Sequence, residues 1–297
     1  MVWDGIIATY LFLAGLGAGA FALAALAGFV RPDAVKLRTI GYVIAPIAVG
    51  VGTVLLMVDA KAGLMNPLRF FGLLGNFSSI MAWGVVILVA FMAVSAIALV
   101  VMLVKKATPK ALDVVGLVCA VAVAVYTGML LGDAPGFPLW NPIVLPLLFL
   151  VSATSTGFAA VLLVAHLMKA EGLESLGFLR KAGLVLPVVE AVLIAALLGV
   201  VSGTGGSAAL AAAASVASLA FGAYAVPFWL GLVLVGLALP FCLELLQASK
   251  AKKAANDGSG STGLAVTGEV GVLVGGFLLR FLVVMAALPV TITVPML

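Results

Sequence analysis

The protein has 297 residues, of which 65% are hydrophobic and only 9% are charged, with a net charge of +4. A soluble domain of this length needs far more polar surface, so the composition excludes a soluble globular protein. A bilayer crossing takes about 20 apolar residues. The composition therefore predicts an all-α polytopic membrane protein with room for eight crossings.

Eight apolar runs predict eight transmembrane helices. In sequence order the predicted spans are 5–30, 40–58, 79–104, 111–131, 143–168, 183–202, 225–247 and 265–288. The first run follows no Lys or Arg and is too long for a signal sequence, so we expect it to stay in the mature protein. The Ala-rich connection after the sixth span is barely polar and could be a re-entrant or interfacial helix.

The basic residues alternate between the connections. Loops one, three, five and seven carry twelve of the 15 Lys and Arg residues, whereas the even loops carry only Lys61 and Arg69. Loop one supplies Arg31, Lys36 and Arg38 to this count. Because cytoplasmic loops are enriched in Lys and Arg, we expect the odd loops in the cytoplasm and both termini on the outer, periplasmic side.

The few metal-binding residue types limit the cofactors. Cys119 and Cys242 lie in apolar runs without a CxxC pattern, so both are interpreted as core residues and not as ligands of an iron–sulfur cluster. The single histidine, His166, cannot supply both axial ligands of a membrane b-type haem. We expect neither haem nor metal on this protein.

Two ionisable residues lie deep in the predicted spans. Arg280 is about 22 Å from the cytoplasmic end of its span at 1.5 Å per residue, and Glu190 is about one-third of the way across its own. A charge at the centre of such a helix costs about 2.5–3.5 kcal/mol, so it is retained with a partner or a task. The two residues could form a structural ion pair, a proton relay or an anchor for a polar ligand.

Hydrogen-bonding side chains gather at the expected outer ends of the first four spans. They are Tyr10, Asp59, Asn76, Ser78, Ser79 and Tyr126. An apolar pocket with such groups suits a lipid-soluble quinone, whose carbonyl oxygens need donors and whose redox step needs a proton acceptor. A phenol can donate to a carbonyl, and Asp59 at the water boundary could exchange protons.

Aromatic residues at these depths have a second interpretation. Tyr10 and Tyr126 could belong to the interfacial aromatic belt, for which Trp3, Trp83 and Trp140 are better candidates.

Other polar and small residues are also informative. His166, Glu244 and Glu269 lie at the expected cytoplasmic ends of their spans, either as solvated end residues or as a route by which protons enter. Gly15 and Gly19, four residues apart in "GLGAG", predict a face where helices pack closely.

Five segments together carry a family resemblance. They are "YLFLAGLGAGAF", "NFSSIMAWGVVIL", "YTGMLL", "WNPIVLPLLFLVSATSTG" and "GGFLLRFLVV". In this order they resemble the NrfD/polysulfide-reductase membrane-subunit family over nearly the whole sequence. The resemblance implies eight helices in two four-helix bundles, residues 1–131 with a quinone site and residues 132–297, and no haem.

The resemblance also implies a site and partners. The quinone, menaquinone or ubiquinone, would lie near the outer face, with Tyr126 as the tyrosine ligand of the fourth helix and Tyr10 as the polar residue of the first. Asp59 is kept from the family's pattern at the end of helix two, and Gly15, Asn76 and Ser79 complete the expected cofactor-binding set. The implied partner is a ferredoxin-like iron–sulfur subunit, joined to a molybdopterin enzyme or a multihaem cytochrome.

We therefore expect a quinone-oxidoreducing membrane anchor of a respiratory complex in a bacterial or archaeal cytoplasmic membrane. Outer loops 59–78 and 132–142 would dock the iron–sulfur partner, terminal-substrate catalysis would lie on another subunit, and no nucleic-acid partner is expected. One alternative is a secondary transporter that grips its substrate with Glu190 and Arg280 at mid-membrane. Another is an assembly anchor without a redox role.

Overall fold

Helices form all the regular structure in the part of the protein that the structure describes. The computed structural model describes residues 3–59, 76, 78–170, 177–253 and 262–290. The elements are α1 (Gly5–Val30), α2 (Val35–Asp59), α5 (Ile80–Lys105), α6 (Lys110–Gly132), α7 (Val144–Leu167), α8 (Gly177–Ser202), η3 (Gly206–Ala208), α9 (Ala209–Ala220), η4 (Pro227–Ala238), α10 (Leu239–Lys253) and α11 (Thr262–Met285). The predicted all-α fold is confirmed.

Among these described residues, eight helices are long and apolar enough to cross a membrane, which confirms the eight predicted spans. The seventh span, Pro227–Gln247, begins as the π-helix η4 and continues into α10. The Ala-rich connection before it contains η3 and α9, so the helical alternative for that connection is the one observed.

Two helices begin five or more residues earlier than the sequence predicts. α2 begins at Val35 instead of residue 40, because Arg38 is ion-paired inside the protein and is not hydrated in a loop. α8 begins at Gly177 instead of residue 183, because Phe178 and Leu179 pack into an apolar cluster with residues of α1 and α2. Tertiary contacts therefore extend both helices past the ends of their apolar runs.

Polar side chains satisfy backbone groups where helices begin. The Asp4 carboxylate accepts a hydrogen bond from Ile6 N–H at 2.7 Å at the start of α1. The Asn141 amide oxygen accepts from the N–H groups of Ile143 and Val144, both at 3.0 Å, at the start of α7. Such caps replace the partners that the first turn of a helix lacks, which matters most near lipid.

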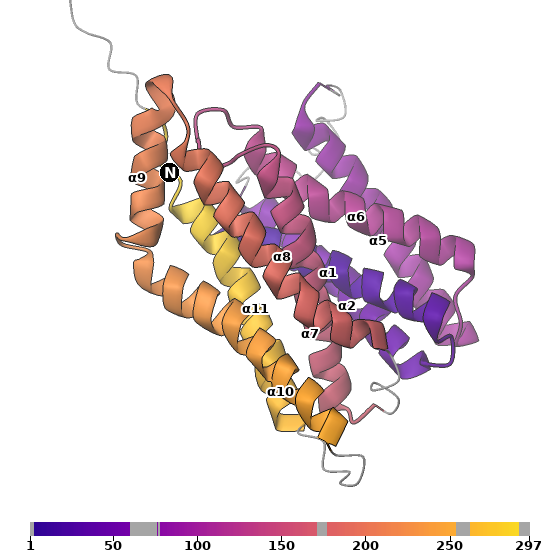
Figure 1. The fold of residues 1–297 in the computed structure, drawn as a ribbon. Helices are drawn as coiled ribbons and strands as arrows, with labels where there is room; N and C mark the ends of the chain where they lie inside the picture. Colours follow the sequence, from indigo (N-terminus) through magenta and orange to yellow (C-terminus); the bar gives the residue numbers. More distant parts are fainter. Residues whose placement is uncertain (1–2, 60–75, 77, 171–176, 254–261, 291–297) are drawn as a thin grey trace, which may run out of the picture.

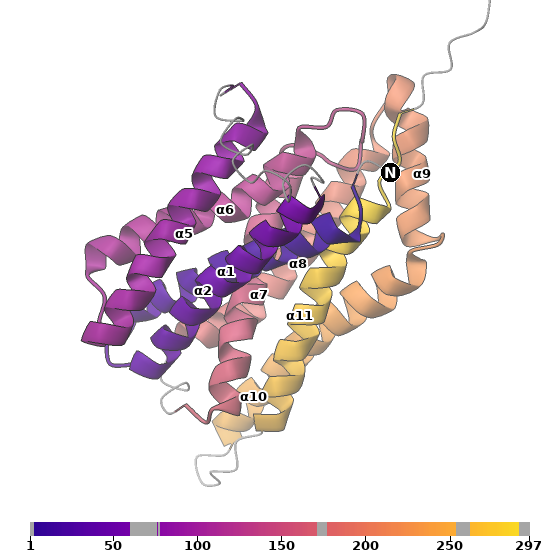
Figure 2. The ribbon, with the colours of Figure 1, turned by 180° about the vertical axis from the view of Figure 1, so that it is seen from behind.

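Helix α1 lies between two groups of helices. Figures 1 and 2 show α2, α5 and α6 towards one side of the molecule, and α11, η4 and α10 towards the other. Gly19 of α1 and Gly157 of α7 touch so closely that a Cβ on either would collide with the backbone of the opposite helix. The close-packing face predicted from "GLGAG" is confirmed, and it joins the two groups. The division at residue 131 into separate bundles stays a prediction.

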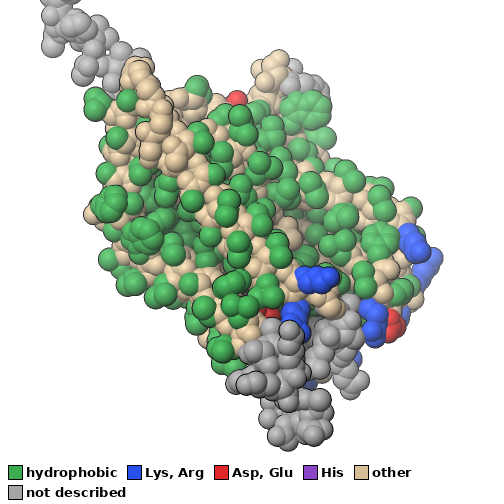
Figure 3. Space-filling model, viewed as in Figure 1, with side chains coloured by type: hydrophobic (Ala, Val, Ile, Leu, Met, Phe, Trp, Pro, Cys, Tyr) green, Lys and Arg blue, Asp and Glu red, His purple; other side chains and the backbone are tan. Residues whose placement is uncertain are grey.

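The surface matches a lipid environment. On the face drawn in Figure 3, hydrophobic side chains cover the helices, and Lys and Arg side chains gather at one end. The length and composition of the helices are those of a multi-pass membrane protein. Which side of the membrane the basic end faces stays a prediction from the alternation of charge.

Candidate functional site

Two tyrosines lie together in the interior of the first four helices. Tyr10 of α1 is fully buried, and its ring packs where α2 presents Gly52. Tyr126 of α6 is also buried, and its ring lies against Gly84 of α5 so closely that a Cβ there would collide with the phenol. The two phenols are near enough to interact electrostatically. The sequence predicts both tyrosines, whereas neither glycine is recognisable from it as part of the site.

The Tyr10 hydroxyl has no hydrogen-bond partner among the residues that the structure describes. A buried polar group without a partner costs about 1–3 kcal/mol, and such groups are rare in folded proteins. A ligand oxygen placed beside this phenol would remove that cost. Burial also excludes Tyr10 from the interfacial aromatic belt, because its ring does not reach the lipid boundary.

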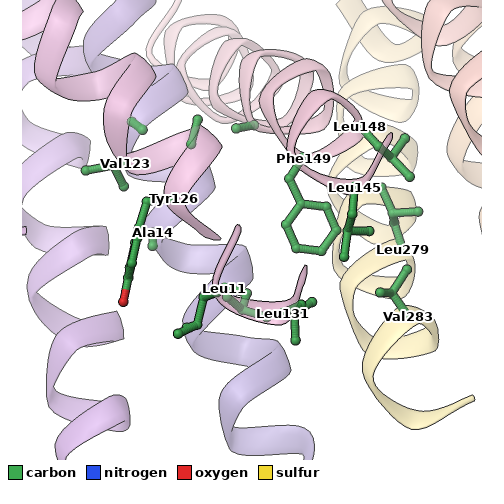
Figure 4. Close-up of a cluster of buried hydrophobic side chains, with 14 of the residues drawn as sticks. Leu11, Ala14, Val123, Tyr126, Leu131, Leu145, Leu148, Phe149, Leu279 and Val283 are labelled. Carbon is green, nitrogen blue, oxygen red and sulfur yellow. The ribbon is translucent and has the colours of Figure 1, made fainter. Parts of the chain in front are cut away.

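Figure 4 shows the apolar surroundings of this site. Tyr126 lies beside Ala14 and Val123, while Phe149 and Leu279 belong to the part of the core formed by α7 and α11. The labelled neighbours of the Tyr126 phenol are apolar, so its surroundings are mainly hydrophobic. This is the composition expected of a pocket that binds an apolar ring and fixes it through a few polar atoms.

The other predicted residues of the first bundle lie where α2 ends and α5 begins. Asp59 is the last residue of α2. Asn76 Oδ1 accepts a hydrogen bond from Ser78 N–H at 3.1 Å, and the Ser79 hydroxyl accepts from Met81 N–H at 3.2 Å, so both side chains shape the start of α5. Gly84 follows Ser79 by five residues, about 7.5 Å along the helix. The Tyr126 phenol thus lies between one and two turns from these caps.

Arg280 is fully buried between three helices. Its Nε donates to the Leu11 carbonyl of α1 at 3.1 Å, and its Nη1 donates to Ser152 Oγ of α7 and to the Gly276 carbonyl, both at 2.9 Å. The ring centroid of Phe149 lies 5.1 Å from the guanidinium carbon, which adds a cation–π contact. This arginine therefore links α1 to the second group of helices.

Gly15 provides the space for this guanidinium. A Cβ on Gly15 would lie 2.6 Å from Nη2 of Arg280. The structure thus places Gly15 against Arg280, while its predicted contact with a quinone stays a prediction.

Glu190 of α8 is buried near the same arginine. It is 3% exposed and close enough to Arg280 for an electrostatic interaction. Among the described residues, no direct ion pair joins the two side chains. The sequence indicates both charged residues, but it does not identify Ser152 as the partner of Arg280.

A buried ion pair was not evident from the sequence. Arg38 of α2 and Asp113 of α6 are each 2% exposed and lie 3.5 Å apart. Asp113 also accepts hydrogen bonds from the Tyr42 hydroxyl at 2.6 Å and the Thr108 hydroxyl at 2.7 Å. The prediction that Arg38 is a loop charge is wrong. Two signals were available in the sequence. Arg38 and Tyr42 are one helical turn apart, and one acidic residue, Asp113, follows three lysines.

His166 of α7 and Glu269 of α11 form another pair. His166 Nδ1 lies 2.7 Å from Glu269 Oε1, and their side chains are 24% and 10% exposed. Glu244 of α10 is half-buried nearby, with its carboxyl group packed where α8 presents Gly183. The interpretation as freely solvated end residues is wrong for the pair. A route for protons through them stays a prediction.

The loop after α6 is fastened to both ends of the described structure. Trp140 Nε1 donates to the Val283 carbonyl at 2.8 Å, and the indole stacks between Trp3 and Phe137, with centroid distances of 5.0 and 4.1 Å. Trp140 is only 3% exposed, so its predicted place in the lipid-facing belt is wrong. The other predicted docking loop, 59–78, lies mostly outside the described residues.

Metal ligands do not cluster in the described ranges. There, no group of three or more His, Cys, Asp and Glu side chains has an arrangement that could hold a metal ion.

Comparisons with known proteins give a consistent result. The model of the family described as "Polysulphide reductase, NrfD" matches residues 1–292. The protein is 33% identical over 312 residues to the C subunit of polysulfide reductase from Wolinella succinogenes, with 96% of this sequence and 94% of that one covered. It is 27% identical over 322 residues to an NrfD homolog of Haemophilus influenzae, with the same coverage, and 30% identical over 277 residues to NrfD of Escherichia coli, with 82% and 84% covered.

Proposed function

The protein belongs to the polysulphide reductase NrfD family, and we propose that it oxidises or reduces a quinone within the membrane and exchanges the electrons with an iron–sulfur partner. Membership makes it a multi-pass subunit of the cytoplasmic membrane that serves an oxidoreductase complex. Beyond this family membership, we propose the binding site, the cofactor and the partner.

The Tyr10 hydroxyl is the observation that carries the proposal. It is fully buried, it has no partner among the described residues, and it lies near a second phenol, that of Tyr126. Quinone carbonyls accept hydrogen bonds, and an isoprenoid quinone reaches such a site from the lipid phase. We assign Tyr126 and Tyr10 as quinone ligands, with Gly15, Asn76 and Ser79 as weaker members of the site.

The quinone, menaquinone or ubiquinone, would supply two-electron redox chemistry, and residues of this protein would hold it and handle its protons. The phenols would orient the carbonyl oxygens, and the surrounding apolar side chains would exclude water. Asp59, at the end of α2, would take or release protons at the water boundary. No haem or metal on this subunit enters the proposal.

The position of the site also supports an iron–sulfur partner. Electron transfer weakens steeply with distance, and the Tyr126 phenol lies within two turns of the start of α5. A ferredoxin-like subunit docked at that end would bring a cluster close to the quinone. The loop after α6, fixed by Trp140, would form part of the docking surface. A molybdopterin or multihaem subunit would then carry the terminal reaction.

The transporter alternative would need Arg280 to hold a substrate. Three hydrogen bonds commit Nε and Nη1 of this guanidinium to two helix carbonyls and Ser152, while Nη2 is buried without a partner among the described residues. Glu190 and Arg280 stay weaker candidates for a proton relay in the second group of helices.

The proposal is tested by separating the quinone reaction from the partner's own activity. In the purified complex, Tyr126→Phe is expected to lower quinol-linked turnover and leave dye-linked turnover of the catalytic subunit unchanged. A smaller amount of quinone should co-purify with the variant than with the wild-type complex. Unchanged quinol-linked turnover would refute the site, and a complex lacking both quinone and an iron–sulfur subunit would refute the function.

A further inference from the structure

The two ends of the group formed by the first four helices differ in their polar residues. At one end lie Asp59 and the polar start of α5. At the other end, the first turns of α2 and α6 are joined by a buried polar cluster, which consists of Arg38, Tyr42, Thr108 and Asp113. The two tyrosines of the candidate site lie near the Asp59 end.

The side chains of the buried polar cluster bind mainly to one another, and Arg38 Nε is buried without a partner among the described residues. Asp113 receives hydrogen bonds from Tyr42 and Thr108 and pairs with Arg38. Arg38 also donates to the Thr108 hydroxyl and to the Pro32 carbonyl at 3.3 Å. Gly28 of α1 leaves room for its guanidinium, since a Cβ there would lie 2.9 Å from Nη2. A carboxylate whose oxygens are committed to this many donors is poorly placed to pass a proton on.

A layer of aromatic rings follows the cluster towards the tyrosines. Phe21 packs edge to face against Tyr42 at 5.2 Å and against Phe91 at 5.7 Å between centroids. All three rings are fully buried. The Phe21 ring also fills the space that Gly116 leaves on α6, where a Cβ would collide with it. The four helices are therefore sealed against one another at this level.

Among the described residues of these four helices, the side chains between this layer and the two phenols are apolar, apart from the partly buried thiol of Cys119. The buried positions one or two turns further along each helix are Ala14, Ala18, Val49, Leu88, Ala120 and Val123. The two nearest buried hydroxyls, Ser95 and Thr127, donate to carbonyls of their own helices, Met92 at 3.1 Å and Ala124 at 2.7 Å. Proton movement needs a chain of hydrogen-bonding groups or water, and a single weakly hydrogen-bonding thiol does not supply one.

We propose that protons of the tyrosine site are exchanged at the Asp59 end of the first four helices, and that the aromatic layer with the buried polar cluster is a proton barrier at their opposite end. This inference rests on the proposed function. When the site oxidises one quinol, two electrons pass to a one-electron acceptor and two O–H bonds break. Both protons then leave on the side of the membrane that the Asp59 end faces.

The test uses the purified complex in proteoliposomes, with a pH-sensitive dye in the lumen and a second one outside. A short-chain menaquinol analogue is the donor, and ferricyanide, which cannot cross the bilayer and takes one electron without a proton, is the outside acceptor. An impermeant amine reagent on the exposed Lys105 and Lys106 reports which end faces outward. Protein-free liposomes give the background.

For molecules with the Asp59 end outward, about two protons per quinol should appear outside at the rate of quinol oxidation, with no change in the lumen. Acidification of the lumen during turnover would overturn the inference while leaving the proposed function intact. A complete lack of quinol oxidation would instead contradict the proposed function.

Two variants of the buried polar cluster serve as controls. Asp113→Asn and Thr108→Val should both oxidise quinol at the wild-type rate and release protons on the same side. Slower proton release, or proton release into the lumen, in either variant would place the cluster on the proton route. That result would overturn the proposal that the cluster is a barrier.

Discussion

The phenol of Tyr126 occupies the space that Gly84 leaves on the facing helix α5. Gly84→Ala should therefore displace the phenol and lower quinol-linked turnover by about tenfold or more, which corresponds to about 1.4 kcal/mol. The added methyl is small, so the protein should still fold. Parallel assays of quinol-linked and dye-linked turnover measure the effect.

Gly50→Ala is the matched control, because a Cβ there would meet only the flexible end of Met92 at 3.4 Å. It should retain wild-type turnover. Equal activity of the two alanine variants would show that the position of the Tyr126 ring does not matter.

Arg280 is expected to contribute to the stability of the folded protein, in addition to any role in a proton relay. Arg280→Lys keeps a charge but cannot reach both the Leu11 carbonyl and the Ser152 hydroxyl. Breaking a buried network of this kind costs about 3–5 kcal/mol, so the melting temperature in detergent should fall clearly. Arg180→Lys, at an exposed position on α8, should not change it. Equal melting temperatures would contradict the assigned linkage between α1 and α7.

The Arg38–Asp113 pair should show strong coupling in a double-mutant cycle. Asp113→Leu alone leaves the Arg38 guanidinium buried without its carboxylate, at a cost of about 3–5 kcal/mol. The double variant with Arg38→Met removes both charges, so it should be more stable than either single variant. Unfolding in detergent measures all four proteins. Additive losses would mean that the two side chains act independently.

The hydroxyl of Tyr42 should contribute less. Tyr42→Phe removes one hydrogen bond to Asp113 but keeps the ring against Phe21, so we expect a loss of about 0.5–1.5 kcal/mol. The same unfolding assay checks this. A loss as large as that of Asp113→Leu would show that the hydroxyl holds the whole cluster together.

The contact between Gly19 and Gly157 should tolerate no side chain. Gly157→Leu forces α1 and α7 apart, and overpacking in a tight core costs about 1–3 kcal/mol or more. The amount of folded protein extracted from membranes should fall. Gly199→Leu on α8, where a Cβ would meet nothing, is the control and should accumulate normally.

The helices were predictable because crossing a bilayer requires long apolar runs, and the sequence has eight of them. The starts of α2 and α8 were less predictable, because Arg38 and Leu179 are buried by tertiary contacts that a hydropathy pattern does not contain. For the same reason, the pattern alone did not decide between a connection and a helix at α9.

The candidate site was predictable in part. Polar residues such as Tyr10 and Tyr126 are conspicuous in apolar sequence, and their depth follows from the span boundaries. Gly84 and Gly52 are not conspicuous, because a glycine that makes room for a ring looks like any other glycine until the facing helix is known. Asp113 was hidden among loop lysines, because its partner lies 75 residues away.

The loop after α6 contacts both ends of the described structure, so these two ends lie close together. Trp3 near its start stacks on Trp140, and Val290 near its end donates a hydrogen bond to the Gly136 carbonyl at 2.8 Å. Both ends thus meet at the junction of the two helix groups. Such proximity of termini is what permits circular permutation in other folds. Here a short linker could join these two ends, so that the second helix group would precede the first in the sequence without any helix moving.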